Sequence, residues 1–238
     1  ARKMQMSLMP AQDFQTDPIE ISGSCQPSTE VGGDHFDFIY FDPDPNRVTV
    51  SVVDVSGKGM AAAVTAIYAS GAINSEISRH HRLEESVTNL NTAICHRKQK
   101  KQFISLLLAE IDIPNRRMAF INAGQSRPLL LRNGRVTILK GVGTPLPLGV
   151  REGTGYLSSE IELQSGDMLL MYTDGVTDAV NEENEMFGNH RLSALFSELG
   201  SRNPTASEMV AEIRNRLSLF SASAKQFDDI TLVAMRVV

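Results

Sequence analysis

The sequence is poor in the residues that mark several functional classes. It has two cysteines and no tryptophan among 238 residues. Cys25 and Cys95 lie far apart without Cys-x-x-Cys spacing, which argues against a zinc site or a disulfide framework, so we expect free thiols. No run reaches the roughly 18 apolar residues of a membrane-spanning helix, and no signal peptide is recognisable. We therefore expect no membrane contact and a cytoplasmic location.

Positive charge is also scarce. The chain has 23 Lys and Arg against 28 Asp and Glu, which gives a formal net charge of -5. Broad binding to nucleic acid or to anionic membranes usually needs a basic face, so this balance argues against both. An enzyme that concentrates carboxylates around divalent cations would show such a charge when it is counted without them.

One domain is the expected organisation. The hydrophobic content of 42% is enough for one substantial core, and no Pro/Gly/Ser-rich linker divides the chain. Met4, Met6, Leu8 and Met9 precede Pro10 in a compact apolar pattern that resembles the end of a helix. We assign residues 1–17 to an N-terminal helical linker remnant, with a plain helical N-terminus as the alternative, and residues 18–238 to a single domain.

The order of predicted elements indicates an α+β fold. Alternating and β-branched runs bounded by turn residues predict strands, at residues 19–24, 36–41, 48–53, 103–113, 118–122, 128–132, 136–139, 160–163, 167–172 and 230–237. Helical spacing predicts helices, at residues 60–77, 84–98, 191–199 and 206–220. A turn is predicted at residues 42–46 and an ordered loop near the site at residues 141–155. This order does not follow a β-α-β rhythm; it predicts an antiparallel β-sandwich flanked by helices on both sides.

Four acidic signatures carry the functional signal. Each places a carboxylate beside a turn or at the end of an apolar run, where cations that prefer oxygen ligands are bound. They are Glu30-Val31-Gly32-Gly33-Asp34, Asp54-Val55-Ser56-Gly57-Lys58-Gly59, Thr173-Asp174-Gly175 and Asp228-Asp229-Ile230-Thr231. A buried carboxylate at a strand end is costly unless a cation or hydrogen-bond donors neutralise it. Together the four signatures favour a metal site over turn chemistry.

The second signature alone has other interpretations. Asp54 or Ser56 could cap the helix that follows. A phosphate-binding P-loop is excluded, because Val53 stands where that loop needs Gly and Gly59 where it needs Ser or Thr. Lys58 could contact a substrate phosphate as a point charge, or be a solvated lysine at a helix start.

No covalent nucleophile is recognisable. Residues 124–128, Gly-Gln-Ser-Arg-Pro, lack the closing Gly of a nucleophile elbow, and neither cysteine lies in a Cys/Arg phosphatase loop. The five histidines lack zincin spacing, so we expect surface or structural roles for them. Two adjacent divalent ions would lower the pKa of a shared water and bind phosphoryl oxygens, without a protein nucleophile. The pattern therefore indicates a metal-dependent phosphatase.

In their order along the chain, the signatures resemble a known family. Further matching blocks are residues 103–106, 122–124, 128–130, 147–149 and 166–179. Over roughly residues 20–238, the sequence is similar to the PPM-type (type 2C-like) metal-dependent serine/threonine protein phosphatases, in their SpoIIE-like bacterial branch. That family's fold is a β-sandwich flanked by helices.

The resemblance implies a metal site with two ions, Mn²⁺ or Mg²⁺. Asp54 would bridge both ions, and the Val55 carbonyl would contact the second. Asp174 and Asp228 would complete the first, and Asp34 would bind the second ion or orient its water.

Supporting roles and departures follow from the same resemblance. Glu30 would support the ligands from outside. Asp229 would also support them rather than bind metal, because the wider family often has Asn at its position. The branch commonly has His where this chain has Gln125, which would change a supporting hydrogen bond but no ligand. The phosphate-binding Arg and the proton-donating His of eukaryotic relatives have no identified counterpart, so the general acid is unassigned.

The resemblance also implies a substrate and partners. Branch members dephosphorylate phosphoserine or phosphothreonine on STAS-type anti-sigma-factor antagonists, in bacterial partner-switching pathways, through a metal-activated water. An upstream sensor or receiver domain would act through the helices predicted at residues 60–79 and 84–98, which can also form a homodimer contact. The alternatives are a catalytically silent partner-binding module on the same scaffold and another metal hydrolase, such as a phosphodiesterase, whose His-rich motifs this chain lacks.

Overall fold

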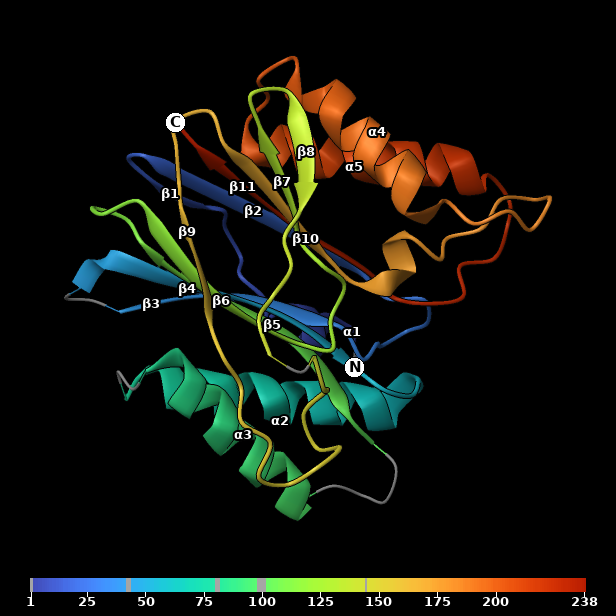
Figure 1. The fold of residues 1–238 in the computed structure, drawn as a ribbon. Coiled ribbons are helices and arrows are strands. Elements are labelled where there is room, and N and C mark those ends of the chain that lie inside the picture. Colours follow the sequence, from blue (N-terminus) through green and yellow to red (C-terminus); the bar gives the residue numbers. More distant parts are fainter. Residues whose placement is uncertain (1, 42–43, 80–81, 98–101, 144) are drawn as a thin grey trace. The chain divides into compact units, whose positions relative to one another are not determined.

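The computed structural model describes residues 2–41, 44–79, 82–97, 102–143 and 145–238 (Figure 1). Its helices are α1 (Arg2–Met6), α2 (Gly59–Ile77), α3 (Leu83–Arg97), α4 (Gly188–Gly200) and α5 (Ala206–Ser221), with a 3-10 helix η1 (Asp174–Val176). Its strands are β1 (Phe14–Thr16), β2 (Ile19–Gln26), β3 (His35–Phe41), β4 (Asp44–Val55), β5 (Ile104–Asp112), β6 (Arg117–Ala123), β7 (Leu129–Arg132), β8 (Arg135–Ile138), β9 (Ser159–Glu162), β10 (Met168–Tyr172) and β11 (Ile230–Val237). No helix of this described part is long and apolar enough to cross a membrane.

The residues form two compact units whose segments alternate along the chain. The first unit comprises Ala1–Pro10, Glu30–Gln125 and Lys140–Leu163. The second comprises Ala11–Thr29, Ser126–Leu139 and Gln164–Val238. Each unit therefore takes one antiparallel sheet and its helices from three separate stretches of sequence.

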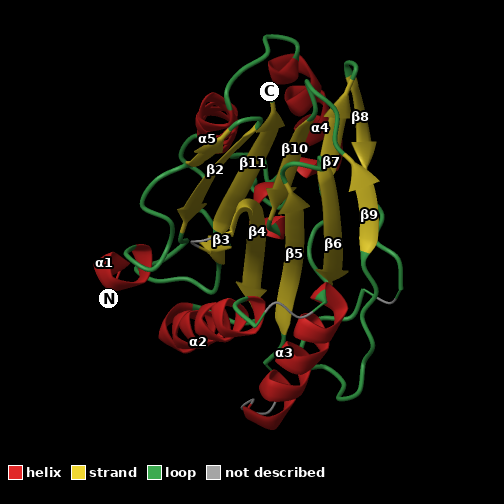
Figure 2. Cartoon of the chain, turned by 90° about the vertical axis from the view of Figure 1, so that its left-hand side faces the viewer, coloured by secondary structure: helices red, strands yellow, loops and turns green. Residues whose placement is uncertain are grey.

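The sheet of the first unit has the strand order β3-β4-β5-β6-β9, and every neighbouring pair is antiparallel. Helices α2 and α3 lie along one face of this sheet (Figure 2). Alternate residues of β5, namely Ile104, Leu106 and Leu108, belong to the core beneath the two helices. This alternation is the period-2 pattern of a strand with one face against helices.

Alanine rather than larger side chains forms the buried face of α2. Ala62, Ala66 and Ala69 are at most 1% exposed and face the core with Ile73. Helical spacing alone would place Val64 and Ile67 on the apolar face, but they are 58% and 36% exposed. Because alanine has only a methyl group, the helix backbone can lie close to the sheet, where larger side chains would not fit.

The sheet of the second unit has the strand order β1-β2-β11-β10-β7-β8, again antiparallel throughout. Met168, Leu170 and Tyr172 of β10 pack with α4 and α5, so one face of this sheet is covered by helices as well. Helix α5 begins with a capping box, in which Thr205 and Glu208 satisfy each other's backbone N–H groups. The start of this helix at residue 206, as predicted from the sequence, is thus confirmed.

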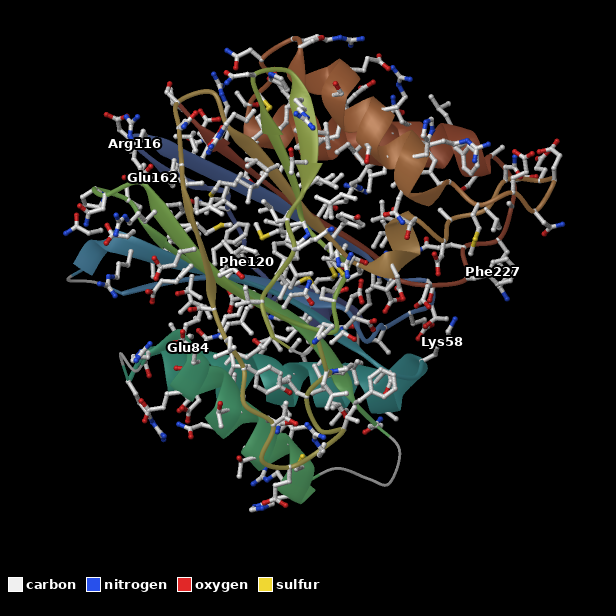
Figure 3. The ribbon with its side chains drawn as sticks, in the orientation of Figure 1. Lys58, Glu84, Arg116, Phe120, Glu162 and Phe227 are labelled. Atoms are coloured by element: carbon white, nitrogen blue, oxygen red, sulfur yellow. The ribbon has the colours of Figure 1, made fainter. Side chains whose placement is uncertain are left out.

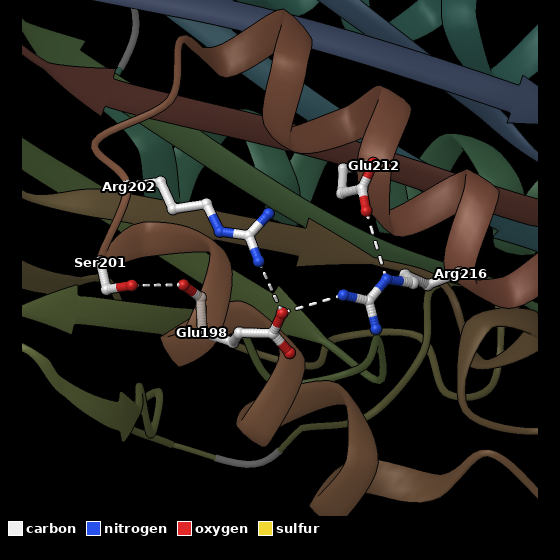
Figure 4. A network of polar contacts seen from close by, with 5 residues as sticks. All are labelled: Glu198, Ser201, Arg202, Glu212 and Arg216. Atoms are coloured by element: carbon white, nitrogen blue, oxygen red, sulfur yellow. Dashed lines mark hydrogen bonds and ion pairs between the residues drawn. The ribbon is translucent and has the colours of Figure 1, made fainter.

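A charged network connects α4 with α5 in the second unit (Figure 4). Glu198 accepts hydrogen bonds from Arg202 at 2.9 Å and from Arg216 at 2.8 Å, and Arg216 also donates to Glu212 at 3.2 Å. These side chains are 37% to 62% exposed, so water screens each pair and the pairs contribute little stability. The stability of this helix pair therefore comes mainly from its apolar contacts.

Two predictions of local structure were wrong in detail. Only Arg2–Met6 of the expected N-terminal helical segment is helical, and Phe14–Thr16 forms β1, which pairs with β2. In α1, Met4 and Met6 are exposed, and the buried residue is Gln5. The turn predicted at residues 42–46 does not include residues 44–46, which belong to β4, and residues 42–43 lie outside the described part. The remaining predicted strands and helices are found within a few residues of their expected bounds.

Asp167 is expected to be a large single contributor to the stability of the second unit. Its carboxylate is 1% exposed and accepts hydrogen bonds from Arg132 at 2.8 and 2.6 Å and from the Gln164 N–H at 2.8 Å. We expect Asp167→Ala to lower the free energy of unfolding by about 2 kcal/mol, since Arg132, 30% exposed, can still reach water. The melting temperature should fall by about 4–8 °C.

The exposed pair Arg191–Glu185 provides the control for this prediction. Its side chains are 47% and 60% exposed and lie 3.1 Å apart. Glu185→Ala should change the free energy of unfolding by less than about 0.5 kcal/mol. Equal effects of the two substitutions in calorimetry would contradict the role given to Asp167.

Candidate metal site

In the first unit, strand register places Asp34 opposite Asp54. His35 pairs with Val53 in the β3–β4 ladder, and the Val55 N–H donates to the Gly33 carbonyl at 3.3 Å. Continuing this register by one residue from His35 sets Asp34 across from Asp54. Two carboxylates directly opposite each other repel, unless a cation lies with them.

The loop before β3 is held tightly against the end of β4. A Cβ atom on Gly33 would lie 2.6 Å from the Val55 carbonyl oxygen, so only glycine permits this approach. The buried Gln5 of α1 donates to the Gly32 carbonyl at 2.7 Å and accepts from the Gly32 N–H at 3.1 Å. The loop that ends at Asp34 is therefore fixed from two directions.

The alternative interpretations of the second signature can now be compared with the structure. Lys58 is the N-cap of α2 and makes no side-chain capping hydrogen bond. The Ser56 hydroxyl instead accepts from the Phe103 N–H at 2.8 Å, and the Ser56 N–H donates to the Phe103 carbonyl at 3.0 Å. Ser56 thus connects the end of β4 to the segment before β5 rather than capping a helix. Lys58 is exposed at the helix start.

In the second unit, the ends of β10 and β11 bring two signatures together. Tyr172 pairs with Leu232 at the ends of the two strands. The next pair is Thr173 and Thr231. The Thr173 N–H donates to the Thr231 carbonyl at 3.1 Å, and the Thr231 N–H donates to the Thr173 hydroxyl at 3.1 Å. Asp174 follows this pair directly and begins η1. The predicted position of Asp174 at a strand end is confirmed.

Asp174 lies in a field of like charge. Asp174 is exposed, but partial desolvation of its carboxylate, followed by repulsion from the carboxylates of Asp228 and Asp178, raises the pKa of the Asp174 carboxyl above its usual value. Asp178 was not selected from the sequence; it is brought near by η1, where its N–H donates to the Asp174 carbonyl at 2.8 Å. In the sequence, the spacing of four residues between Asp174 and Asp178 was the only sign that the two carboxylates lie close together. Their mutual repulsion is what a bound cation would relieve.

Asp229 is occupied by hydrogen bonds within the second unit. Its carboxylate accepts from the Ser28 N–H at 2.7 Å and from the Ser28 hydroxyl at 3.0 Å. Its carbonyl oxygen would lie 2.0 Å from a Cβ atom on Gly175. Asp229 therefore holds the chain after β2 beside η1, whereas the Asp228 carboxylate accepts from the Asp229 N–H at 2.9 Å.

The other residues considered from the sequence are not gathered at these strand ends. Glu30 is exposed, His96 pairs with Glu152 at the surface, and His190 is exposed. His35 is buried, and this burial lowers the pKa of its imidazole, which favours a neutral structural histidine. His80 and His81 lie outside the described residues. Cys25 and Cys95 form no disulfide, as expected.

The donor set fits a divalent ion of the Mg²⁺ or Mn²⁺ type. Carboxylates and a backbone carbonyl are oxygen ligands, and glycine permits the close approach of backbone at Gly33 and at Gly175. Within the described ranges, no three His, Cys, Asp or Glu side chains form a group that could hold a metal by themselves. Each unit therefore presents a pair of carboxylates, Asp34 with Asp54 and Asp174 with Asp228.

Comparison with known proteins gives an independent result. The sequence model of the family described as Stage II sporulation protein E (SpoIIE) matches residues 44–238. The phosphoserine phosphatase RsbU of Bacillus subtilis is 24% identical over 236 residues, which cover 99% of this chain and 68% of that protein. The residues matched by the family model include the last three acidic signatures.

Solved structures are similar over nearly the whole chain. The SiaA-PP2C domain of Pseudomonas aeruginosa matches with a TM-score of 0.84 at 21% identity, covering 100% of this chain and 94% of that one. The catalytic domain of the serine/threonine protein phosphatase PstP, solved with two manganese ions, matches with a TM-score of 0.62 at 19% identity, covering 93% and 99%. These similarities confirm the predicted fold class.

Proposed function

Because the chain belongs to the SpoIIE family and has the fold of PP2C phosphatases, we propose that it is a metal-dependent protein-serine/threonine phosphatase. The observation that carries the proposal is the pairing of carboxylates at strand ends, Asp34 opposite Asp54 in one unit and Asp174 beside Asp228 in the other. In both pairs, like charges are kept together by the backbone, at a cost that a divalent cation would offset.

We assign the metal ligands residue by residue. The proposed ligands are the carboxylates of Asp34, Asp54, Asp174 and Asp228 and the carbonyl of Val55. Asp54 would be shared by two ions, Mn²⁺ or Mg²⁺. When bound, the ions lower the pKa of a water and neutralise charge on the phosphoryl oxygens. The PstP structure with two manganese ions supports this assignment by analogy of fold.

The roles of the surrounding residues follow from their contacts. Gln5 and Gly33 hold Asp34 against the end of β4, and the Thr173–Thr231 hydrogen bonds fix the start of η1, so little reorganisation is needed when substrate arrives. Asp229 keeps its place through Ser28 and acts as support rather than as a ligand. Glu30 would be a more distant support.

The proposed substrate is a phosphoserine or phosphothreonine on a STAS-type anti-sigma-factor antagonist, in a bacterial partner-switching pathway. The similarity to the phosphoserine phosphatase RsbU supports phosphoserine as the group that is hydrolysed. The proposal also includes an upstream sensor or receiver domain and a homodimer contact through α2 and α3. It further includes a cytoplasmic location and a single phosphatase domain at residues 18–238.

Removing the metal should abolish the activity. We expect phosphate release from a phosphoserine STAS-type protein with Mn²⁺ or Mg²⁺, and a fall of at least about a hundredfold with excess chelator, restored by added metal. The measurement is phosphate release over time at fixed protein concentration. Release that is unaffected by chelator would contradict the metal assignment. A folded protein that binds the partner without releasing phosphate would favour the silent binding module.

A further inference from the structure

A groove extends from the proposed metal ligands of the second unit along the segment that joins α5 to β11. One cavity, of about 280 Å³, is lined by Asp178 and Asp228 at one end. A second cavity, of about 400 Å³, shares Val180, Lys225 and Phe227 with the first. Because the two cavities share these lining residues, they are neighbours, and we call them together the Lys225 groove.

The groove begins at the proposed site of chemistry. Asp228 is a proposed metal ligand, and it also lines the first cavity. A phosphoserine side chain is short, so the residues beside it in the substrate stay close to Asp228 when its phosphate is there, and Lys225 and Phe227 line the same cavity as Asp228. The groove is thus continuous with the place where a phosphoprotein substrate would react.

The walls of the groove combine apolar surface with one cation. Phe227 is 58% exposed on the segment before β11 (Figure 3), and the wall behind it includes Leu217 and Ile230. Lys225 is exposed, and it is the single Lys or Arg among the described residues that line the two cavities. An exposed aromatic ring beside a cation is suited to an apolar side chain followed or preceded by a carboxylate.

Most of the acidic groups at the groove are engaged. The Ser223 hydroxyl donates a short hydrogen bond to Glu182, and the Asp228 carboxylate accepts from the Asp229 N–H at 2.9 Å. Asp178 raises the pKa of Asp174, so its charge acts on the proposed metal site. Bound divalent ions would counter the charge of Asp178 and Asp228, and Glu182 lines only the second cavity, so Lys225 is the cation that an approaching carboxylate meets in the first cavity.

The segment that carries Lys225 and Phe227 is held in shape before any ligand binds. The Gln226 amide donates to the Gln26 carbonyl at 2.9 Å and to the Asp228 carbonyl at 2.8 Å, and the Gln26 amide donates to Gln226 at 2.9 Å. The Ala224 N–H donates to the Ser221 carbonyl at 2.7 Å. A surface that is already ordered loses little entropy on binding, which favours specific recognition.

We propose that the Lys225 groove is the substrate-specificity site, which binds the residues flanking the phosphoserine of the protein substrate. Phe227 packs against an apolar side chain of the substrate, and Lys225 pairs with a nearby carboxylate. This inference rests on the proposed phosphatase activity and adds the sequence class that the enzyme selects.

Steady-state kinetics with two phosphoserine peptides test the groove, with Mn²⁺ present. One peptide carries Leu and Glu beside the phosphoserine, and the other carries Gly and Ser. The wild type should show a kcat/KM at least about tenfold higher for the Leu/Glu peptide. Phe227→Ala and Lys225→Glu should each reduce that preference to below about threefold, chiefly through KM.

A charge exchange distinguishes recognition from mere structural support. With Lys225→Glu, a peptide that carries Lys in place of Glu should become the better substrate, which a loop that only positions Asp228 would not produce. Arg214→Glu, an exposed cation of α5 outside the groove, is the matched control and should keep the wild-type preference.

Each outcome has one meaning. An unchanged peptide preference in both variants, or no preference in the wild type, would contradict the role proposed for the Lys225 groove. The phosphatase activity would still be established by the release of phosphate. If the wild type released phosphate neither from the two peptides nor from p-nitrophenyl phosphate, the proposed function itself would be refuted. The role proposed for the Lys225 groove would then be refuted as well.

Discussion

Asp174→Asn is expected to lower metal-dependent phosphate release by on the order of a thousandfold, equivalent to about 4 kcal/mol of lost transition-state stabilisation. Asparagine keeps the size of the side chain but removes the charge that would hold a divalent ion. Release should be measured with Mn²⁺ and a phosphoserine substrate over a range of metal concentrations. Excess Mn²⁺ should not restore the wild-type rate.

The same substitution should leave the metal-free fold intact. Asp174 is repelled by Asp228 and Asp178, so removing its charge relieves an unfavourable interaction, and the melting temperature without metal should not fall. In the wild type, added Mn²⁺ should raise the melting temperature by mass action, and Asp174→Asn should lose most of this increase. Asp13→Asn, an exposed aspartate of the same unit, is the control. More than a tenth of wild-type activity in Asp174→Asn would refute the ligand assignment.

Gly175→Ala should lower the stability of the second unit and abolish phosphatase activity. The new Cβ atom would lie 2.0 Å from the Asp229 carbonyl oxygen and 2.9 Å from its carbon, and neither atom belongs to a flexible side chain. The chain at η1 must then move away from Asp229, which strains the Thr173–Thr231 hydrogen bonds. We expect a loss of about 3 kcal/mol in the free energy of unfolding and a melting temperature about 6–12 °C lower.

Gly71→Ala is the matched control for this prediction. Gly71 lies inside α2, and no atom is within 4 Å of the position its Cβ would take. Alanine is favoured over glycine in a helix by about 0.5–1 kcal/mol, so this variant should be more stable than the wild type. Thermal unfolding of both variants checks the pair. A Gly175→Ala protein as stable as the wild type would show that the backbone at η1 can move freely.

The strand-end carboxylates could be predicted from the sequence because each stands beside a clear strand. The apolar run of β10 ends at Tyr172, and β11 begins directly after Asp228-Asp229, so the positions of Asp174 and Asp228 follow from the strand pattern. The pairing of Asp34 with Asp54 could not be predicted in the same way. It depends on the register of β3 with β4, which no local pattern specifies.

Other features were missed because local patterns rank residues by size and polarity. Val64 and Ile67 contribute most to a hydrophobic pattern in α2, yet the structure buries the alanines. Gln5 is polar and was overlooked between two methionines, although its side chain, 3% exposed, makes two hydrogen bonds with Gly32. Asp178 was missed because η1, which brings it near Asp174, is only three residues long. In each case a tertiary contact decided the outcome.

The central position of β11 has a consequence for how the protein is made. This strand lies between β2 and β10, so its partner β2 is synthesised some 200 residues before it, as the pairing of Ile19 with Val237 shows. The second sheet cannot close until Val237 has left the ribosome, and β2 must wait unpaired on that side during synthesis. Such distant pairing slows folding and exposes strand edges meanwhile. Loss of even a few residues from β11 would open the sheet in its middle rather than trim its edge, and Asp228 would lose its support.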